Sequence, residues 1–242
     1  QPRGNTLRIL IFAGLASIAG PASAERLTID RIYGGGNLNG PTPIELKIAP
    51  DGARVTFLRA KADDQTTFDL WEYNVKAATT RLLLDSRRVL PNGEQLSDVE
   101  KARRERARSA ERHGIVDYSW GPDGRKLLLP LNGKVYIYDL TVAPERALRE
   151  LDTGGEAVDP QISPKGRYVT YLRDQNLWLI DLTDGKARQL TRDGGGAIHN
   201  GEAEFVAQEE MSRFEGYWWA PDDSALAIER FDETHVAQVK RF

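Results

Sequence analysis

One turn motif recurs along the chain, and it constrains the fold more than any other feature of the sequence. Its four copies are Ala49-Pro50-Asp51-Gly52, Gly121-Pro122-Asp123-Gly124, Ser163-Pro164-Lys165-Gly166 and Ala220-Pro221-Asp222-Asp223. Proline fixes φ at the first central position of such a turn, and Asp-Gly or Lys-Gly supplies a residue that tolerates positive φ. Each copy therefore predicts a tight reversal of the chain.

Strand-like segments follow the turns in a regular order. Apolar β-prone runs come directly after each turn, at 54–58, 126–129, 167–171 and 225–228. Third strands are indicated at 69–73, 135–139 and 176–181, and fourth strands at 80–84 and 187–190. Four short strands repeated every ~40–50 residues are typical of a propeller blade. A β-sandwich would not repeat one unit with one turn. The sequence thus predicts an all-β chain, a partial β-propeller of four-stranded antiparallel blades, with 27–33 as a candidate strand of a further blade.

A charged helix is expected between the first two blades. Ser97 and Glu100 form a capping-box pattern, and Gly114 is a plausible stop, so the helix would cover 98–113. Its body carries five arginines and almost no apolar stripe. Such a helix has no face to bury, so we expect it to project as a solvated arm.

A second inserted segment, 202–211, is acidic and compatible with a short helix. Both insertions join the last strand of one blade to the first strand of the next, and in a propeller all such crossovers lie on one face. Its adjacent carboxylates, Glu209 and Glu210, would repel by about 4 kcal/mol at ~4 Å unless they share a cation. An ammonium group, with three donors, suits such a pair. The alternative, a surface Glu-Glu pair that points into water, stays open on these residues alone.

Composition excludes several classes of function. The formal charge is -3 without a concentrated basic segment, so nucleic acid is not an expected partner. The chain has no cysteine and only three separated histidines, so neither a metal site nor a cofactor is predicted. Residues 1–24 have a basic start, a short apolar run and a small-residue cleavage site, as in a signal peptide whose beginning is missing. We therefore expect secretion, most simply to the periplasm, with no membrane attachment after cleavage.

Two blocks of the sequence resemble a known family. The segment 204–211, with Glu209 and Glu210, followed by the Tyr-Trp-Trp-Ala-Pro-Asp run at 217–222, is similar to the double-glutamate motif of dipeptidyl peptidase IV. The segment 231–236 resembles the stretch after the corresponding strand in that family, and the resemblance extends from about residue 27 to the end. It implies that 25–242 is the N-terminal portion of a propeller, cut before its closure and before a catalytic α/β-hydrolase domain.

The resemblance also implies a role for specific residues. Glu209 and Glu210 would hold the free α-ammonium of a peptide substrate, so that a serine peptidase releases dipeptides with Pro or Ala second. The family uses a propeller arginine on the first peptide carbonyl, and we predict Arg106, or Arg104, from the arm. Whether the parent is a homodimer is left open.

The catalytic residues of such an enzyme are not recognisable in this chain. It contains no Gly-x-Ser-x-Gly elbow, so the chain alone is expected to be inactive while the parent is a peptidase. Ser163, the serine of a repeat turn, is assigned a structural role. The competing hypothesis is a non-catalytic periplasmic propeller that acts as a protein-binding scaffold, for which a paired-glutamate clamp has no use.

Overall fold

The computed structural model describes residues 27–33, 38, 40, 42–237 and 239, which fall into two units, Gln1–Leu38 and Asn39–Phe242. In the first unit they form one short helix, α1 (Ile29–Tyr33), so the strand predicted at 27–33 is wrong. The predicted signal segment 1–24 lies outside the described residues. Across the described part of the chain, no helix combines the length and apolar character needed to cross a membrane.

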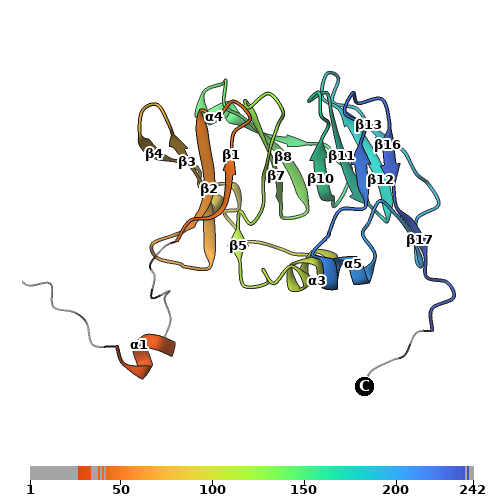
Figure 1. Cartoon of the computed structure of the whole chain (residues 1–242), viewed down its shortest axis with the longest axis horizontal. Helices are drawn as coiled ribbons and strands as arrows, with labels where there is room; N and C mark the ends of the chain where they lie inside the picture. Colours follow the sequence, from red (N-terminus) through yellow and green to blue (C-terminus); the bar gives the residue numbers. More distant parts are fainter. Residues whose placement is uncertain (1–26, 34–37, 39, 41, 238, 240–242) are drawn as a thin grey trace, which may run out of the picture. The chain divides into compact units, whose positions relative to one another are not determined.

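The second unit is a series of antiparallel sheets, which we call blades 1 to 4 (Figure 1). Blade 1 contains β1 (Ile44–Ile48), β2 (Arg54–Ala60), β3 (Thr67–Asn74) and β4 (Thr79–Leu84); blade 2 contains β6 (Ser119–Trp120), β7 (Lys126–Leu131), β8 (Lys134–Asp139) and β9 (Leu148–Leu151); blade 3 contains β10 (Val158–Ile162), β11 (Tyr168–Arg173), β12 (Asn176–Asp181) and β13 (Ala187–Gln189); blade 4 contains β15 (Tyr217–Trp219) and β16 (Leu226–Ile228). The predicted four-strand unit is therefore present in full in blades 1, 2 and 3.

Two further pairings lie outside this repeat. The strand β5 (His113–Gly114) pairs in parallel with β3, and β14 (Ile198–Asn200) pairs with β17 (Arg230–Asp232).

The repeated turns have one geometry. In each, the fourth residue donates its backbone N–H to the carbonyl of the first, at 2.8 Å for Gly52, 3.1 Å for Gly124, 2.8 Å for Gly166 and 3.0 Å for Asp223. All four of these residues have positive φ, between 64° and 74°. The turn chemistry predicted from proline and glycine is confirmed, and Asp223 adopts at a steric cost the conformation that glycine takes freely.

Neighbouring blades are joined through the tryptophans that precede two of the turns. The indole Nε1 of Trp120 in blade 2 donates to Oγ1 of Thr56 in blade 1 at 3.0 Å. Trp219 in blade 4 donates in the same way to Thr170 in blade 3 at 3.1 Å. Where blade 3 meets blade 2, Ile162 takes the place of tryptophan and packs against the cluster that contains Leu128. The first and third blade junctions are thus alike, and the second is apolar.

The hydrophobic core lies between the blades. One cluster joins blades 1 and 2 around Leu58, Leu70 and Leu127, and a second joins blades 2 and 3 around Leu128 and Val169, all five fully buried. A smaller cluster around Tyr217 joins blades 3 and 4. Each blade therefore depends on its neighbours for burial, as expected of a repeat architecture.

The charged insertion differs from the prediction in two ways. The helix α3 (Asp98–Arg106) begins as predicted, with Ser97 Oγ accepting from the N–H of Glu100, but it ends seven residues before His113. Its chain then reverses through Arg108, which has positive φ, toward β5. The helix is also no free arm, because Arg104 is 4% exposed and Arg103 forms an ion pair with Asp159 of blade 3. The arm is held to the blades by ion pairs. A search for an apolar stripe along the helix does not detect contacts of this kind.

The remaining helices are short. The acidic helix predicted within 202–211 is present as α5 (Phe205–Met211), and α3 and α5 lie at the same end of the blades (Figure 1). Single-turn helices α2 (Ser86–Val89) and α4 (Pro144–Ala147) follow β4 and β8. The first strand of blade 2, β6, comprises only Ser119–Trp120.

Candidate functional site

Side chains of the two inserted segments, which contain α3 and α5, contact each other. Nη1 of Arg106, the last residue of α3, donates to Oε1 of Gln208 on α5 at 3.0 Å. Nε of Arg106 lies 3.8 Å from Oε1 of Glu209, and its guanidinium stands 5.4 Å from the centroid of the Phe205 ring. The predicted candidates Arg106 and Glu209 are therefore neighbours in space, although they come from different blade connections.

The helix α5 is held at both ends, which fixes the direction of its acidic face. At its start, the carboxylate of Glu204 accepts hydrogen bonds from the N–H groups of Val206 and Ala207, both at 2.7 Å. At its end, Ser212 takes a left-handed conformation and Arg213 donates its backbone N–H to the carbonyl of Ala207. A seven-residue helix is too short to be stable by itself, so these contacts determine its geometry.

Glu209 and Glu210 both present their side chains to solvent. The side chain of Glu209 is 40% exposed beside the 33% exposed Arg106, and Glu210 is exposed as well. Within the described residues, the Glu210 carboxylate has no hydrogen bond or ion pair. One carboxylate of the pair thus already has a cation nearby, and the other has acceptor capacity free for a ligand.

Arg104, the other arginine that the sequence suggested, is already bonded within the protein. Its guanidinium is enclosed by the carboxylates of Glu94 and Glu100 and the carbonyl of Arg112, at 2.8 to 3.3 Å. Glu94 in turn accepts from the backbone N–H of Gly114 at 3.0 Å. This buried network ties α3 to the segment that leads into blade 2, and the Arg104 side chain is only 5% exposed. Arg104 has a structural role.

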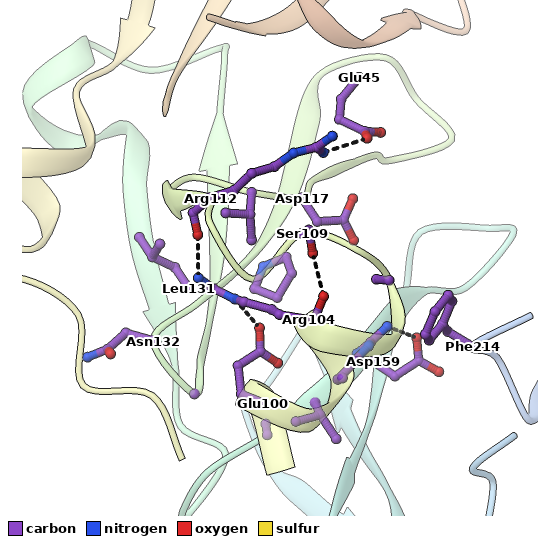
Figure 2. Close-up of a pocket in the computed structure, with 17 residues that line it drawn as sticks. Glu45, Glu100, Arg104, Ser109, Arg112, Asp117, Leu131, Asn132, Asp159 and Phe214 are labelled. Atoms are coloured by element: carbon purple, nitrogen blue, oxygen red, sulfur yellow. Dashed lines mark hydrogen bonds and ion pairs between the residues drawn. The ribbon is translucent and has the colours of Figure 1, made fainter. Parts of the chain in front are cut away.

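A cavity of about 210 Å³ lies between α3 and the first strands of the blades (Figure 2). Four carboxylates line it, Glu100 of α3 and Glu45, Asp117 and Asp159 of the blades. The three blade carboxylates each stand five residues before the proline of a repeat turn. Each has one cation: Arg112 with Glu45 at 3.5 Å, Lys47 with Asp117 at 3.1 Å and Arg103 with Asp159 at 3.3 Å. Sequence reasoning missed these residues, although a carboxylate at one fixed place in three repeats was a signal for them.

Asp159 differs from the other two carboxylates because it is buried. Burial raises the pKa of its carboxyl group to about 6, against the opposing effect of Arg103. Tyr217 donates its hydroxyl hydrogen to the backbone carbonyl of Asp159, and burial raises the pKa of that phenol well above its ordinary value.

The other polar side chains that could support chemistry have structural partners. Ser163 is fully buried, donates to Asp223 at 2.6 Å and accepts from the N–H of Tyr168, as its assigned structural role requires. His199, in β14, lies 2.7 Å from Glu202 and stacks on Phe231. Within the described part of the chain, no cluster of three or more His, Asp or Glu residues could hold a metal ion.

Comparison with known proteins places the chain in a family. The profile of the dipeptidyl peptidase IV N-terminal region matches residues 121–242, half of the chain. The chain belongs to the dipeptidyl peptidase IV family. Dipeptidyl peptidase 4 of Felis catus is 27% identical over 140 residues, which are 53% of this chain and 18% of that protein. Dipeptidyl aminopeptidase A of Saccharomyces cerevisiae is 33% identical over 79 residues, 32% of this chain and 8% of that protein.

A solved structure has the same fold. Porphyromonas gingivalis dipeptidyl peptidase 4 superposes with a TM-score of 0.55 and 22% sequence identity, over 79% of this chain and 26% of that one. The predicted all-β class and partial propeller are thus confirmed. The chain spans less than a fifth of the length of either curated relative. The peptidase activity in their names therefore belongs to proteins much longer than this chain.

Proposed function

We propose that this chain is the substrate-selecting part of a dipeptidyl peptidase IV-type serine peptidase. In this proposal Glu209 and Glu210 bind the N-terminal ammonium of a peptide, and Arg106 donates to the carbonyl of its first peptide unit. Holding the amino terminus at a fixed distance from the nucleophile limits the product to two residues, X-Pro or X-Ala. The substrates are peptides with a free N-terminus, and the catalytic serine belongs to another part of the protein.

The observation that carries the proposal is the meeting of Arg106 with α5. A guanidinium beside Glu209 reduces the repulsion between the two carboxylates, so the pair can remain charged in the absence of substrate. An ammonium group offers each carboxylate a charge-assisted hydrogen bond. The guanidinium retains donors beyond its bond to Gln208 and can reach a carbonyl oxygen of the same ligand.

Family membership favours this function over the scaffold alternative. A secreted, non-catalytic propeller that binds proteins would have no need of two adjacent exposed carboxylates with an arginine beside one of them. We propose export to the periplasm on the strength of the 1–24 segment.

The test is a double substitution, Glu209→Gln with Glu210→Gln, in the full-length protein. Gln keeps the size of each side chain and removes its charge, so kcat/KM for a chromogenic dipeptide reporter with proline second should fall at least a hundredfold. The matched control is Glu105→Gln with Glu111→Gln, two exposed glutamates of the α3 segment that change the net charge equally.

Two results would overturn the proposal. Unchanged kinetics of the double variant would remove the ammonium-binding role from the pair. Full-length protein that releases no dipeptide from any such reporter would favour the scaffold instead.

A further inference from the structure

The carboxylate of Asp159 is buried, and only one of its two oxygens has a hydrogen-bond partner among the described residues. Its Oδ1 lies 3.3 Å from Nη2 of Arg103, and its side chain is 10% exposed. Its Oδ2 is inaccessible and has no hydrogen-bond partner among the described residues. Its φ of 49° is in the left-handed region, at the irregularity where β10 shifts register against β11. A buried charge that lacks full hydrogen bonding and a strained backbone both cost free energy, so such a residue calls for an explanation.

The equivalent carboxylates show what an ordinary residue at this position does. Glu45 has the same left-handed backbone, with φ of 51°, but its side chain is 39% exposed and its arginine is 35% exposed. The Asp117 side chain is 55% exposed. Exposed pairs of this kind contribute little energy because water screens them. Only the carboxylate in blade 3 is enclosed.

The Asp159–Arg103 pair leads directly to the candidate substrate site. Arg103 precedes Arg106 by three residues on α3, so the two arginines lie on one face of the helix. The Arg103 guanidinium also lies 5.9 Å from the centroid of the Phe214 ring, which stands three residues after the end of α5. Figure 2 shows Asp159 and Phe214 together at one side of the cavity. The pair thus sits where blade 3, α3 and the chain that leaves α5 come together.

We propose that Asp159 is a positioning residue for the ammonium-binding site: by holding Arg103 it fixes the face of α3 that presents Arg106 to Gln208 and Glu209. This inference rests on the proposed function. Asp159 touches no substrate in this arrangement, and its effect reaches the ligand through Arg103 and the helix. Residues that contact no ligand can still change its affinity through the groups that they hold.

The same contact makes the site sensitive to acid. The charged and titratable groups facing Asp159 are Arg103 from α3, Glu215 and Tyr217 from the segment entering β15, and Asp117 before β6. Burial, Glu215 and Asp117 raise the pKa of Asp159 to about 6, and Arg103 opposes them. The carboxylate is therefore charged at pH 7 and gains a proton as the pH falls to 5. Protonation removes the charge that holds Arg103, and peptide binding weakens.

The experiment measures binding of the dipeptide alanyl-proline to the full-length protein by calorimetry, with its N-acetylated form as a ligand control. Asp159→Asn and Arg103→Gln should each raise Kd about tenfold at pH 7. KM for the reporter should rise in parallel while kcat stays the same, and Arg103→Lys should retain most of the affinity. Between pH 7 and pH 5 the Kd of the wild type should rise toward the value of Asp159→Asn, while the Kd of Asp159→Asn should change little.

The control is Glu45→Gln, which removes the exposed pair at the equivalent position of blade 1 and should leave Kd unchanged. Wild-type affinity in both Asp159→Asn and Arg103→Gln would overturn the inference. If those variants bind normally while Glu209→Gln with Glu210→Gln does not, the positioning role alone fails; if the double glutamine variant binds normally, the proposed function fails. Should Asp159→Asn lose its cooperative melt, Arg103→Gln, at a 28% exposed side chain, decides the question by itself.

Discussion

Arg106 donates a hydrogen bond to Gln208 across 102 positions of sequence, and this contact is one of several that join the two insertions of the propeller. Arg106 is the last residue of α3, and Gln208 lies in the middle of α5. Each helix lies in the connection that comes after the last strand of a different blade. The contact therefore depends on the blade repeat, which brings both connections to one end of the strands (Figure 1).

Arg106→Gln in the full-length protein should weaken catalysis without weakening the fold. The substitution removes the charged donor that we assign to the substrate carbonyl, and such a hydrogen bond corresponds to a loss of about tenfold to hundredfold in kcat/KM. Steady-state kinetics on a dipeptide reporter measures it. Arg108→Gln, at an exposed arginine of the same segment, should behave as the wild type. Equal losses in the two variants would indicate a nonspecific effect of charge.

Arg104→Met should, by contrast, lower the free energy of unfolding. It leaves the enclosed carboxylates of Glu94 and Glu100 without their cation, at side chains that are 9% and 20% exposed. Breaking a buried pair from one side costs about 3 kcal/mol. Urea unfolding should show this loss in the free energy of unfolding, while Arg108→Met shows almost none. A variant that keeps full stability would contradict the assigned structural role.

Asp159→Asn should stabilise the protein at pH 8 even as it weakens binding. The pKa of Asp159 is about 6 in the folded protein and near 3.8 when unfolded, so the folded state holds the proton more tightly. Its contribution to stability is present below pH 3.8 and is lost as the pH rises through 6, which amounts to about 3 kcal/mol.

The neutral variant avoids that loss. The free energy of unfolding at pH 8 should therefore rise by about 1 to 3 kcal/mol, and the difference from the wild type should shrink toward pH 4. Asp117→Asn, at an exposed carboxylate, serves as the control. If Asp159→Asn is less stable than the wild type at pH 8, the carboxylate stabilises the fold and the argument from its burial is wrong.

Thr56→Val and Thr170→Val should each destabilise the protein by about 1 to 2 kcal/mol, because each leaves the indole N–H of a part-buried tryptophan without its acceptor. Valine has the shape of threonine, so packing between the blades is preserved. Thermal unfolding of both variants measures the effect. Thr80→Val, at an exposed position of β4, is the control. Unequal losses at the two junctions would show that they are not equivalent.

The blades could be predicted from the sequence because their signals are local. A proline and a glycine in one turn determine φ at positions a few residues apart, and Ser97 caps α3 within the same turn of helix. The position of Glu209 and Glu210 on a short helix followed in the same way from adjacent residues. Local patterns of this kind need no knowledge of the neighbouring blade.

The docking of the arm could not be predicted in this way. Arg103 meets Asp159 across 56 residues, and nothing in either local sequence identifies the partner. A helix rich in arginine and glutamate is expected to be solvated, because burial is normally inferred from apolar side chains. Here Arg104 is buried by other charged groups. The early end of α3 has a similar cause. The contacts of Arg103, Arg104 and Arg106 hold the helix in place, and the chain then reverses at Arg108, which has positive φ.

An arm attached by ion pairs rather than by apolar surface responds to ionic strength. Salt at physiological concentration screens exposed charges beyond about 8 Å and affects enclosed ones much less. The Arg112–Glu45 contact should therefore loosen first as salt increases, while the network around Arg104 persists. If the proposed function holds, peptide binding would weaken in concentrated salt for two reasons: the attraction between ammonium and carboxylate decreases, and the helix that carries Arg106 gains freedom to move.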